Sequence, residues 1–151
     1  MFVSVTRLRV RSVIYLLPFL WRTSFANRQV VRAPGFLGGS LLVDRHRTYW
    51  TLTVWESELA MKAFRGAGAH AKAMPRLASW CDEGAYAHWV APDAAIPTWP
   101  EAYEHLLAEG RLSRVSNPSP DHEARRFVPP RFKPLVGQDL KPVIAPAPVK
   151  G

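Results

Sequence analysis

Residues 48–55 carry the clearest hydrophobic pattern of the chain, because bulky or β-branched side chains fill both alternating rows of the segment. The two rows are Tyr49, Thr51, Thr53 and Trp55, and Trp50, Leu52 and Val54. Such side chains favour a β-strand, and bulk in both rows indicates a strand that is covered on both faces. We therefore expect the rest of the fold to be arranged around this strand.

Two helical pieces separated by glycines are expected after this strand. Ser57 is a favourable N-cap, because its hydroxyl can accept a hydrogen bond from a free N–H of the first turn. The helix predicted over 57–65 ends at Gly66-Ala67-Gly68. A second helical piece is predicted over 69–80, and His70 lies at its start.

Strict alternation predicts another strand over residues 2–10, and an apolar helix after it. The helix has Pro18 in its first turn, where proline is tolerated, and extends to about Arg32. Its expected apolar face consists of Phe19, Ala26 and Val30 together with Trp21 and Phe25.

The same N-terminal region has the outline of a secretory signal, with arginines before the apolar run 13–21 and small residues at 24–26. A signal has no reason to alternate like a strand, so the strand is the preferred interpretation and a signal peptide stays the alternative. The apolar run is also shorter than the roughly 20 residues that cross a bilayer, so no membrane partner is expected.

The remaining pattern completes a β-α-β-β-α-β order. Strands are expected at 36–43 and 85–90, with a turn at 80–84 before the second, and a helix at 101–109 follows. This order is typical of the ferredoxin-like α+β fold, in which a four-stranded antiparallel sheet carries helices on one face. Because residues 48–55 are bulky on both sides, a second subunit is expected to cover the other face.

Composition divides the chain at about residue 112. Residues 1–112 form the expected domain, whereas 113–151 hold most of the 14 prolines and an excess of basic side chains. We expect an extended proline-rich arm over 113–151, with disorder in roughly the last 15 residues.

The formal net charge is +8, and 15 of the 20 basic residues are arginine. Arginine binds phosphates and carboxylates well, but an arginine-rich proteome gives the same bias without any function. The aromatic side chains lie in the mildly acidic middle of the chain and the arginines at its ends, so nucleic-acid binding is ranked last. The single cysteine, Cys81, permits no intramolecular disulfide, which fits a reducing, cytoplasmic location.

Five histidines are present, and no nucleotide-binding, nucleophile-elbow or zinc-protease motif accompanies them. His46, His105 and His122 are expected to be solvated. His70 follows a helix end and His88 lies on an aromatic strand, so the two are expected to converge across the gap between helices and sheet. The alternative is that both are packed histidines with backbone partners.

Aromatic side chains are concentrated near these two histidines. The expected walls of a pocket for a planar apolar ligand are Trp55, Phe64, Met74, Tyr86 and Trp89. Six tryptophans in 151 residues also suit a well-packed core or a dimer seam, and this second use stays open.

The run Trp55-Glu56-Ser57-Glu58, followed by Ala60, Phe64 and His70, resembles the strand-to-helix passage of the antibiotic-biosynthesis-monooxygenase-like superfamily of dimeric α+β barrels. The longer run 51–83 is similar to uncharacterised bacterial proteins of this superfamily. Some of those are described as spheroidene-monooxygenase-like, or as members of a domain of unknown function. The resemblance extends over residues 2–110.

This resemblance implies a ferredoxin-like protomer, a sheet-to-sheet homodimer and a pocket between sheet and helices. Superfamily members include cofactor-independent quinone-forming monooxygenases and haem-degrading enzymes, so the fold alone does not select a reaction. The haem-degrading pattern has an Asn on the first strand and a Trp on the helix, where this chain offers Ser4 or Thr6 and Phe64. Haem degradation is therefore disfavoured, while haem binding through His70 stays open.

The leading hypothesis is a monooxygenase-like oxidoreductase that acts on a planar apolar or phenolic small molecule. His70 would act as a base or as an axial ligand, and His88 would have a secondary role. The sequence requires no cofactor, and haem is the candidate if one is bound. The alternative is a non-catalytic dimeric module that binds a small molecule or haem.

Overall fold

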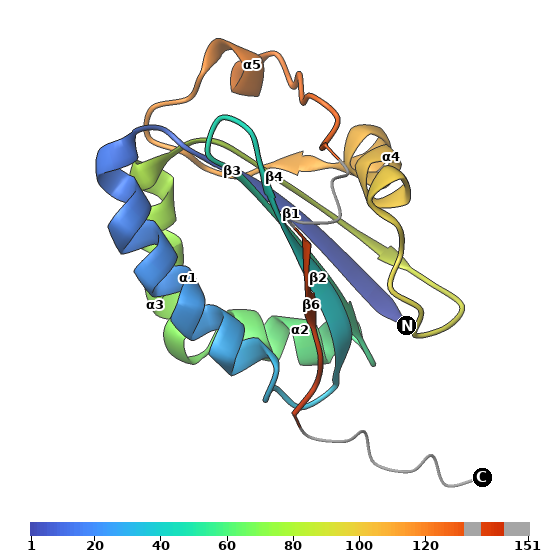
Figure 1. The fold of residues 1–151 in the computed structure, drawn as a ribbon. Helices are drawn as coiled ribbons and strands as arrows, with labels where there is room; N and C mark the ends of the chain where they lie inside the picture. The colour runs from blue at the N-terminus through green and yellow to red at the C-terminus, as the bar shows by residue number, and fades with distance from the viewer. Residues whose placement is uncertain (132–136, 144–151) are drawn as a thin grey trace, which may run out of the picture.

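An antiparallel sheet of six strands organises the fold (Figure 1). The computed structural model describes residues 1–131 and 137–143, and within them the strand order is β5-β4-β1-β3-β2-β6. The strands are β1 (Phe2–Val10), β2 (Phe36–Asp44), β3 (Thr48–Trp55), β4 (Cys81–Val90), β5 (Arg111–Leu112) and β6 (Gly137–Leu140). The central four have the expected ferredoxin-like order, but the sheet has six strands rather than four, because β5 pairs with β4 and β6 with β2.

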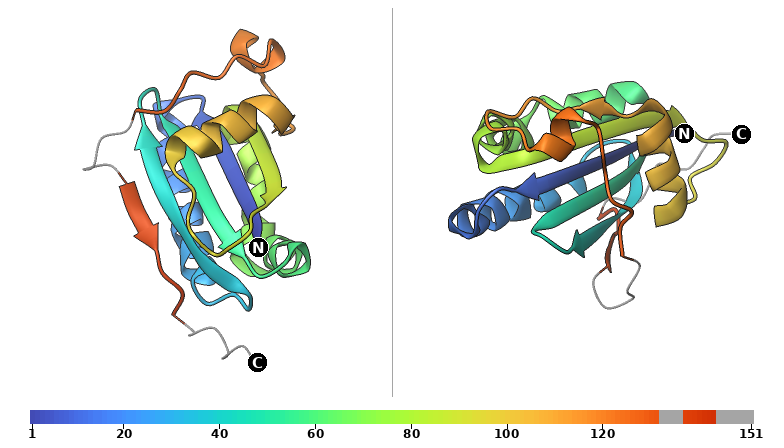
Figure 2. Two further views of the ribbon diagram at one scale, coloured as in Figure 1. Left: turned by 90° about the vertical axis from the view of Figure 1, so that its right-hand side faces the viewer. Right: turned by 90° about the horizontal axis from the view of Figure 1, so that it is seen from above.

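Helices cover both faces of this sheet (Figures 1 and 2). One face carries α1 (Leu16–Val30), which follows the 3-10 turn η1 (Val13–Tyr15), together with α2 (Glu58–Arg65) and α3 (Gly68–Trp80). The other face carries α4 (Trp99–Glu109) and the short α5 (Pro120–Glu123). β1 and β3 begin and end where alternation placed them, so the strand interpretation of residues 2–10 is confirmed.

The sheet face below α4 is buried within a single chain. Its core comprises Val3, Val5, Leu42, Trp50, Leu52, Val54, Ala85, Ala87, Ala102, Leu106 and Phe127. Figure 2 shows α4 lying across this face, and Trp50 below it is only 1 % exposed. Helices of the same chain therefore cover both faces of β3, which explains why both of its rows hold bulky side chains. A second subunit is not needed to cover this face, and the homodimer stays a prediction.

β4 begins at Cys81, so the turn predicted at 80–84 is wrong. The acidic pair in this segment is held by arginines of β1 rather than by solvent. Arg7 Nη1 lies 2.6 Å from Glu83 Oε2 in a buried ion pair, and Arg9 donates to both carboxylate oxygens of Asp82 at 2.9 and 2.8 Å. Asp82 and Glu83 look like part of a turn in the sequence, but they belong to β4 and pair with arginines of β1. The sequence pattern does not show this pairing, because the arginines lie 73 or more residues earlier in the chain.

The beginning of the arm is fixed to the same part of β4. Ser119 Oγ donates to Glu83 Oε1 at 2.9 Å, and the backbone N–H of Gly84 donates to His122 Nδ1 at 3.2 Å. Phe127 then joins the core below α4. His122 is 5 % exposed, so the prediction that it is solvated is wrong.

The later part of the arm returns to the sheet. β6 pairs with β2 at residues 137–140, within the segment for which disorder was predicted, and the backbone N–H of Val143 donates to Val31 O at 2.7 Å. The rest of that segment, residues 144–151, lies outside the described residues.

Replacing Glu83 by alanine is expected to lower the free energy of unfolding by about 3–5 kcal/mol, because Arg7 is then buried without its partner charge. The control is Lys62→Ala, which removes an exposed ion pair with Glu58 and should change stability little. Urea unfolding followed by tryptophan fluorescence measures both variants. Equally small changes in the two would contradict an anchoring role for the Arg7–Glu83 pair.

Candidate functional site

Polar side chains occupy the middle of the sheet face that looks toward α1 and α3. Strand register places them in two rows across β3, β1 and β4, which we call the polar rows: Thr53, Ser4 and His88, and Thr51, Thr6 and Tyr86. Ser4 and Thr53 are 8 % exposed, and the other four side chains are half-buried. An interface packed for stability alone is expected to be apolar at such central positions.

Two apolar clusters flank the polar rows, one on each side along the direction of the strands. The first comprises Val30, Phe36, Trp55, Met61 and Leu140, and the second comprises Val10, Phe19, Leu77 and Cys81. α1 contributes to both clusters, α2 to the first and α3 to the second. The helices are therefore fixed to the sheet at both ends, and the polar rows lie between these contacts.

His70 is held in one tautomer by the helix end before it. Its Nδ1 lies 3.1 Å from the backbone oxygen of Arg65. Because a carbonyl oxygen can only accept, Nδ1 carries the proton and Nε2 is left as the acceptor nitrogen. Burial lowers the pKa of His70, the Arg65 charge lowers it further, and the hydrogen bond to Arg65 O opposes both. The imidazole is thus neutral at neutral pH and can accept a proton at Nε2.

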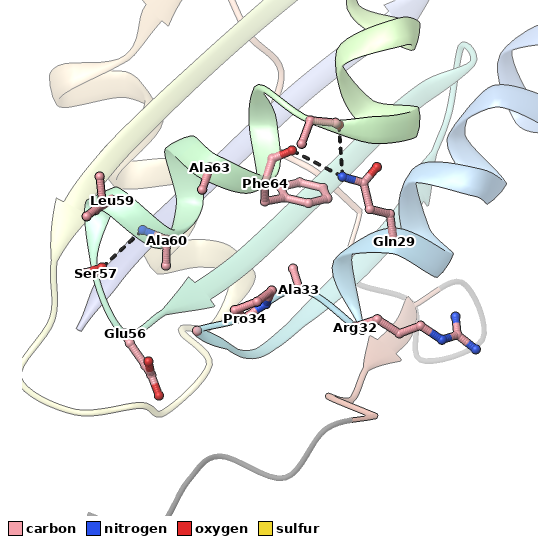
Figure 3. A pocket seen from close by; sticks show the side chains of 12 residues that line it. Gln29, Arg32, Ala33, Pro34, Glu56, Ser57, Leu59, Ala60, Ala63 and Phe64 are labelled. Carbon is pink, nitrogen blue, oxygen red and sulfur yellow. Dashed lines mark hydrogen bonds between the residues drawn. The ribbon is translucent and has the colours of Figure 1, made fainter.

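Gln29 of α1 builds the junction that positions His70. Its Nε2 donates to Ala67 O at 3.0 Å and to Phe64 O at 3.4 Å, as Figure 3 shows, and its Oε1 accepts from the backbone N–H of His70 at 3.0 Å. Gly68 has a φ of +56°, and a Cβ there would lie 2.9 Å from Gln29 Oε1. Glycine is therefore required at the start of α3 by both the backbone and the close approach of Gln29.

Aromatic rings connect His70 with the sheet. The Phe64 ring lies 4.8 Å from the His70 ring and 5.2 Å from the Trp55 ring. Trp55 is the register partner of Phe2 on β1, and the Phe2 ring lies 5.4 Å from His88. We call these rings, together with Tyr86 at 5.2 Å from His88, the aromatic series; within it, Trp55 and Phe2 are related by strand register.

His88 lies on the sheet side of this series. Burial lowers its pKa, and the nearby Arg65 charge lowers it further. The approach of His70 and His88 to each other across the helix–sheet interface stays a prediction. Both side chains are neutral at neutral pH, so both can accept protons or hydrogen bonds.

Two of the predicted wall residues lie elsewhere. Trp89 faces α4 because neighbouring residues of a strand point to opposite faces. There it stacks on His105, with ring centroids 4.0 Å apart, and His105 is half-buried. Met74 on α3 is 44 % exposed. Of the predicted walls, Trp55, Phe64 and Tyr86 belong to the aromatic series.

A groove of about 630 Å³ lies on the outer side of this region, between the end of α1, the turn at 33–35 and α2 (Figure 3). Phe64 lines the groove as well as contacting His70, and Arg32 and Glu56 are its charged lining residues. The predicted N-cap of α2 forms its edge, with Ser57 Oγ accepting from the backbone N–H of Ala60 at 3.2 Å.

Few of the described side chains near this site could bind a metal ion or act as a nucleophile. Among residues 1–131 and 137–143, no three His, Cys, Asp or Glu side chains are placed to hold a metal ion together. Burial raises the pKa of the Cys81 thiol to about 12, so Cys81 is a packing residue rather than a nucleophile.

Comparisons with known proteins agree with this fold. The family model described as "Domain of unknown function (DUF3291)" matches residues 18–121. A Nitrosomonas europaea protein assigned to the antibiotic biosynthesis monooxygenases is 16 % identical, with a TM-score of 0.55 over 62 % of this chain and 100 % of its own. Rv0793 from Mycobacterium tuberculosis is 11 % identical, with a TM-score of 0.55 over 61 % of this chain and 95 % of its own.

SnoaB from Streptomyces nogalater, described as a cofactor-independent oxygenase, is 18 % identical, with a TM-score of 0.51 over 64 % of this chain and 97 % of its own. At these identities the likeness shows the fold, and it confirms the resemblance to the antibiotic-biosynthesis-monooxygenase-like superfamily at that level. No protein of curated function matches the chain.

Gly68→Ala is expected to destabilise the fold by about 1–3 kcal/mol, because alanine is strained at positive φ and its Cβ meets Gln29. Gly66→Ala is the matched control: Gly66 has a φ of −83° and its Cβ would stand 3.4 Å from Lys62 O. Chemical unfolding compares the two, and equal stability of both variants would contradict the positioning role of Gly68.

Protonation of His70 and His88 is expected below the ordinary histidine pKa of 6.5, because burial penalises both imidazolium forms. The unfolded chain then binds protons first, so this contribution to stability is complete above pH 6.5 and is lost as the pH falls below it. NMR titration of the imidazole C–H signals measures both midpoints. A midpoint at or above 6.5 for either residue would contradict its burial in the neutral form.

Proposed function

The chain belongs to the DUF3291 family, a domain of unknown function, and from this premise we propose that it is a monooxygenase-like oxidoreductase. The proposed substrate is a planar apolar or phenolic small molecule, and the proposed oxidant is O2. The proposed site is the helix–sheet interface at the polar rows, with His70 as the base and His88 as a secondary polar group.

The main support for this proposal is the polar rows. They place six hydrogen-bonding side chains in the middle of a sheet face, next to an aromatic series that includes Phe64, Trp55 and Phe2. A planar phenol needs this combination, since aromatic walls hold its rings and a few polar groups fix its orientation. Ser4 and Thr53 are buried between two apolar clusters, and Thr53 Oγ1 donates to Ser4 O at 3.4 Å.

A metal-free oxygenase needs a substrate that loses a proton and then reduces O2 itself. His70 Nε2 takes the proton from an acidic CH2 group of the phenolic substrate. The resulting carbanion gives electrons to O2, and overall the CH2 group and O2 become a C=O group and water. The role of the protein is to supply a neutral base, walls that exclude water, and orientation.

The fold neighbours support this chemistry at the level of architecture. SnoaB is described as a cofactor-independent oxygenase and shares the fold with a TM-score of 0.51. The same arrangement of sheet and helices is therefore compatible with oxygenation without a bound cofactor. The proposed substrate rests on the side chains of this chain and not on those of SnoaB.

Haem binding is the second candidate, because the acceptor nitrogen of His70 is also the atom that ligates iron in haem proteins. His70 would hold the group on one side, with Phe64 beside it. When bound, haem would supply the activation of O2, and His70 would then serve as a ligand instead of a base.

A homodimer is part of the proposal because the superfamily that this chain resembles is dimeric. The face below α4 is already covered, so the contact is expected at another surface. Size-exclusion chromatography with light scattering tests this, and a monomeric mass at micromolar concentration would contradict it.

Oxygen uptake with 1,8-dihydroxyanthrone, a planar phenol with an acidic CH2 group, tests the reaction. Wild-type protein is expected to accelerate uptake, and His70→Ala to lower kcat by about 10²–10⁴-fold, the usual contribution of a general base. His46→Asn, in the turn between β2 and β3, is the control and should leave kcat unchanged. The wild-type rate should fall only below pH 6.5, because the pKa of His70 is lowered.

The other outcomes separate the alternatives. If the anthrone binds but no oxygen is taken up, the protein is a binding module and not an enzyme. A Soret band on titration with haemin that His70→Ala abolishes would favour the haem protein. Absence of both anthrone binding and a Soret band would contradict the site itself.

A further inference from the structure

The helix α1 is apolar on two opposite sides. Phe19 and Val30 face the sheet and are 2 % and 3 % exposed. The opposite side carries exposed Leu17, Leu20, Trp21 and Phe25, and Leu17 is 81 % exposed. Together with exposed Val13 and Ile14 of η1, these residues form what we call the exposed apolar ridge. Trp21 and Phe25 therefore do not belong to the core face where the sequence pattern placed them. A helix with a second apolar side has a surface that favours a partner.

The helices that carry and adjoin this ridge have basic but no acidic side chains. η1, α1 and α3 contain no Asp or Glu, and α1 and α3 lie side by side as the outer layer of the molecule (Figure 1). The basic side chains of the two helices are Arg22, Arg28, Lys72 and Arg76. The Arg28 guanidinium lies 5.7 Å from the centre of the Phe25 ring, so charge and apolar surface are adjacent.

We propose that the outer surface of α1 and α3 docks on an anionic lipid surface. The ridge supplies leucine, isoleucine, phenylalanine and tryptophan, the side chains that enter the boundary between headgroups and acyl chains. The basic side chains around it match anionic headgroups. No helix within residues 1–131 and 137–143 is long and apolar enough to cross a bilayer, so the contact is peripheral.

Charge distinguishes this occupant from a second copy of the chain. A two-fold contact through α1 would bring Arg22 and Arg28 of each copy toward the same side chains of the other. No carboxylate of α1 or α3 would be present to offset that repulsion. An anionic lipid surface provides both the apolar interior and the opposite charge. This inference replaces the expectation of no membrane partner, and it does not depend on the proposed oxygenase.

Co-sedimentation with vesicles tests the proposal on the full-length protein. The expected result is binding to vesicles of phosphatidylcholine with roughly 30 % phosphatidylglycerol and much weaker binding to phosphatidylcholine alone. Leu17→Glu/Trp21→Glu is expected to lower the affinity for the anionic vesicles at least about tenfold, because two inserted apolar groups are lost. Leu107→Glu changes a leucine on α4 that is 53 % exposed, on the opposite side of the sheet, and should bind like wild type.

Circular dichroism confirms that the variants are folded before they are compared. Equal binding to neutral and anionic vesicles, or equal loss in Leu17→Glu/Trp21→Glu and Leu107→Glu, would overturn the proposal. The proposal would also be overturned if the protein did not bind vesicles and light scattering showed a dimer that Leu17→Glu/Trp21→Glu dissociates. The ridge would then be the contact with a second copy of the chain. Oxygen uptake by Leu17→Glu/Trp21→Glu should stay at the wild-type level, which separates this surface from the proposed reaction site.

Discussion

The register of β1 between β3 and β4 is the constraint on which both faces of the molecule depend. Alternate residues of β1 point to opposite faces, so this register puts Val3 and Val5 below α4 and Ser4 and Thr6 below the helices α1 and α3. A shift of one residue would exchange the apolar and polar sets. The ion pairs of Arg7 with Glu83 and of Arg9 with Asp82 oppose such a shift, because they form only when β1 and β4 are paired in this register.

Each face then receives a different cover from the same chain. α4 and Phe127 close the apolar face completely, which removes the reason for a sheet-to-sheet partner there. On the other face, α1 contributes to two apolar clusters, and the polar rows lie between them. α1 thereby has three roles. It holds Gln29 against the start of α3, it closes the helix side of the candidate site, and it presents the exposed apolar ridge.

The sequence predicts those parts of the fold that depend on local patterns. The bounds of β1 and β3 follow from alternation, and the N-cap of α2 follows from Ser57. The start of β4 could not be read in this way, because Asp82 and Glu83 resemble a turn until their arginine partners on β1 are known. The same holds for His122, whose burial depends on a backbone contact with Gly84.

In the candidate site, too, local patterns predict some neighbours, whereas others depend on how the strands pair. His70, Phe64 and Trp55 are predicted as neighbours, because helix and strand signals place them on adjoining elements, and the rings are in contact. Trp89 does not share a pocket with Tyr86 and His88, because alternate residues of β4 point to opposite faces and Trp89 lies on the face of α4. The polar rows were not recognised, since their threonines and serine look unremarkable in each strand. Only the pairing of three strands brings them together.

Methyl NMR during an anaerobic titration with 1,8-dihydroxyanthrone tests the central claim most directly, because threonine and valine methyls report the two faces separately. The account predicts chemical-shift changes at the methyls of Thr6, Thr51 and Thr53, and none at Val5 and Leu52 on the face below α4. Changes confined to Ala60 and Ala63 in the outer groove, or to the methyls below α4, would contradict a ligand site at the polar rows.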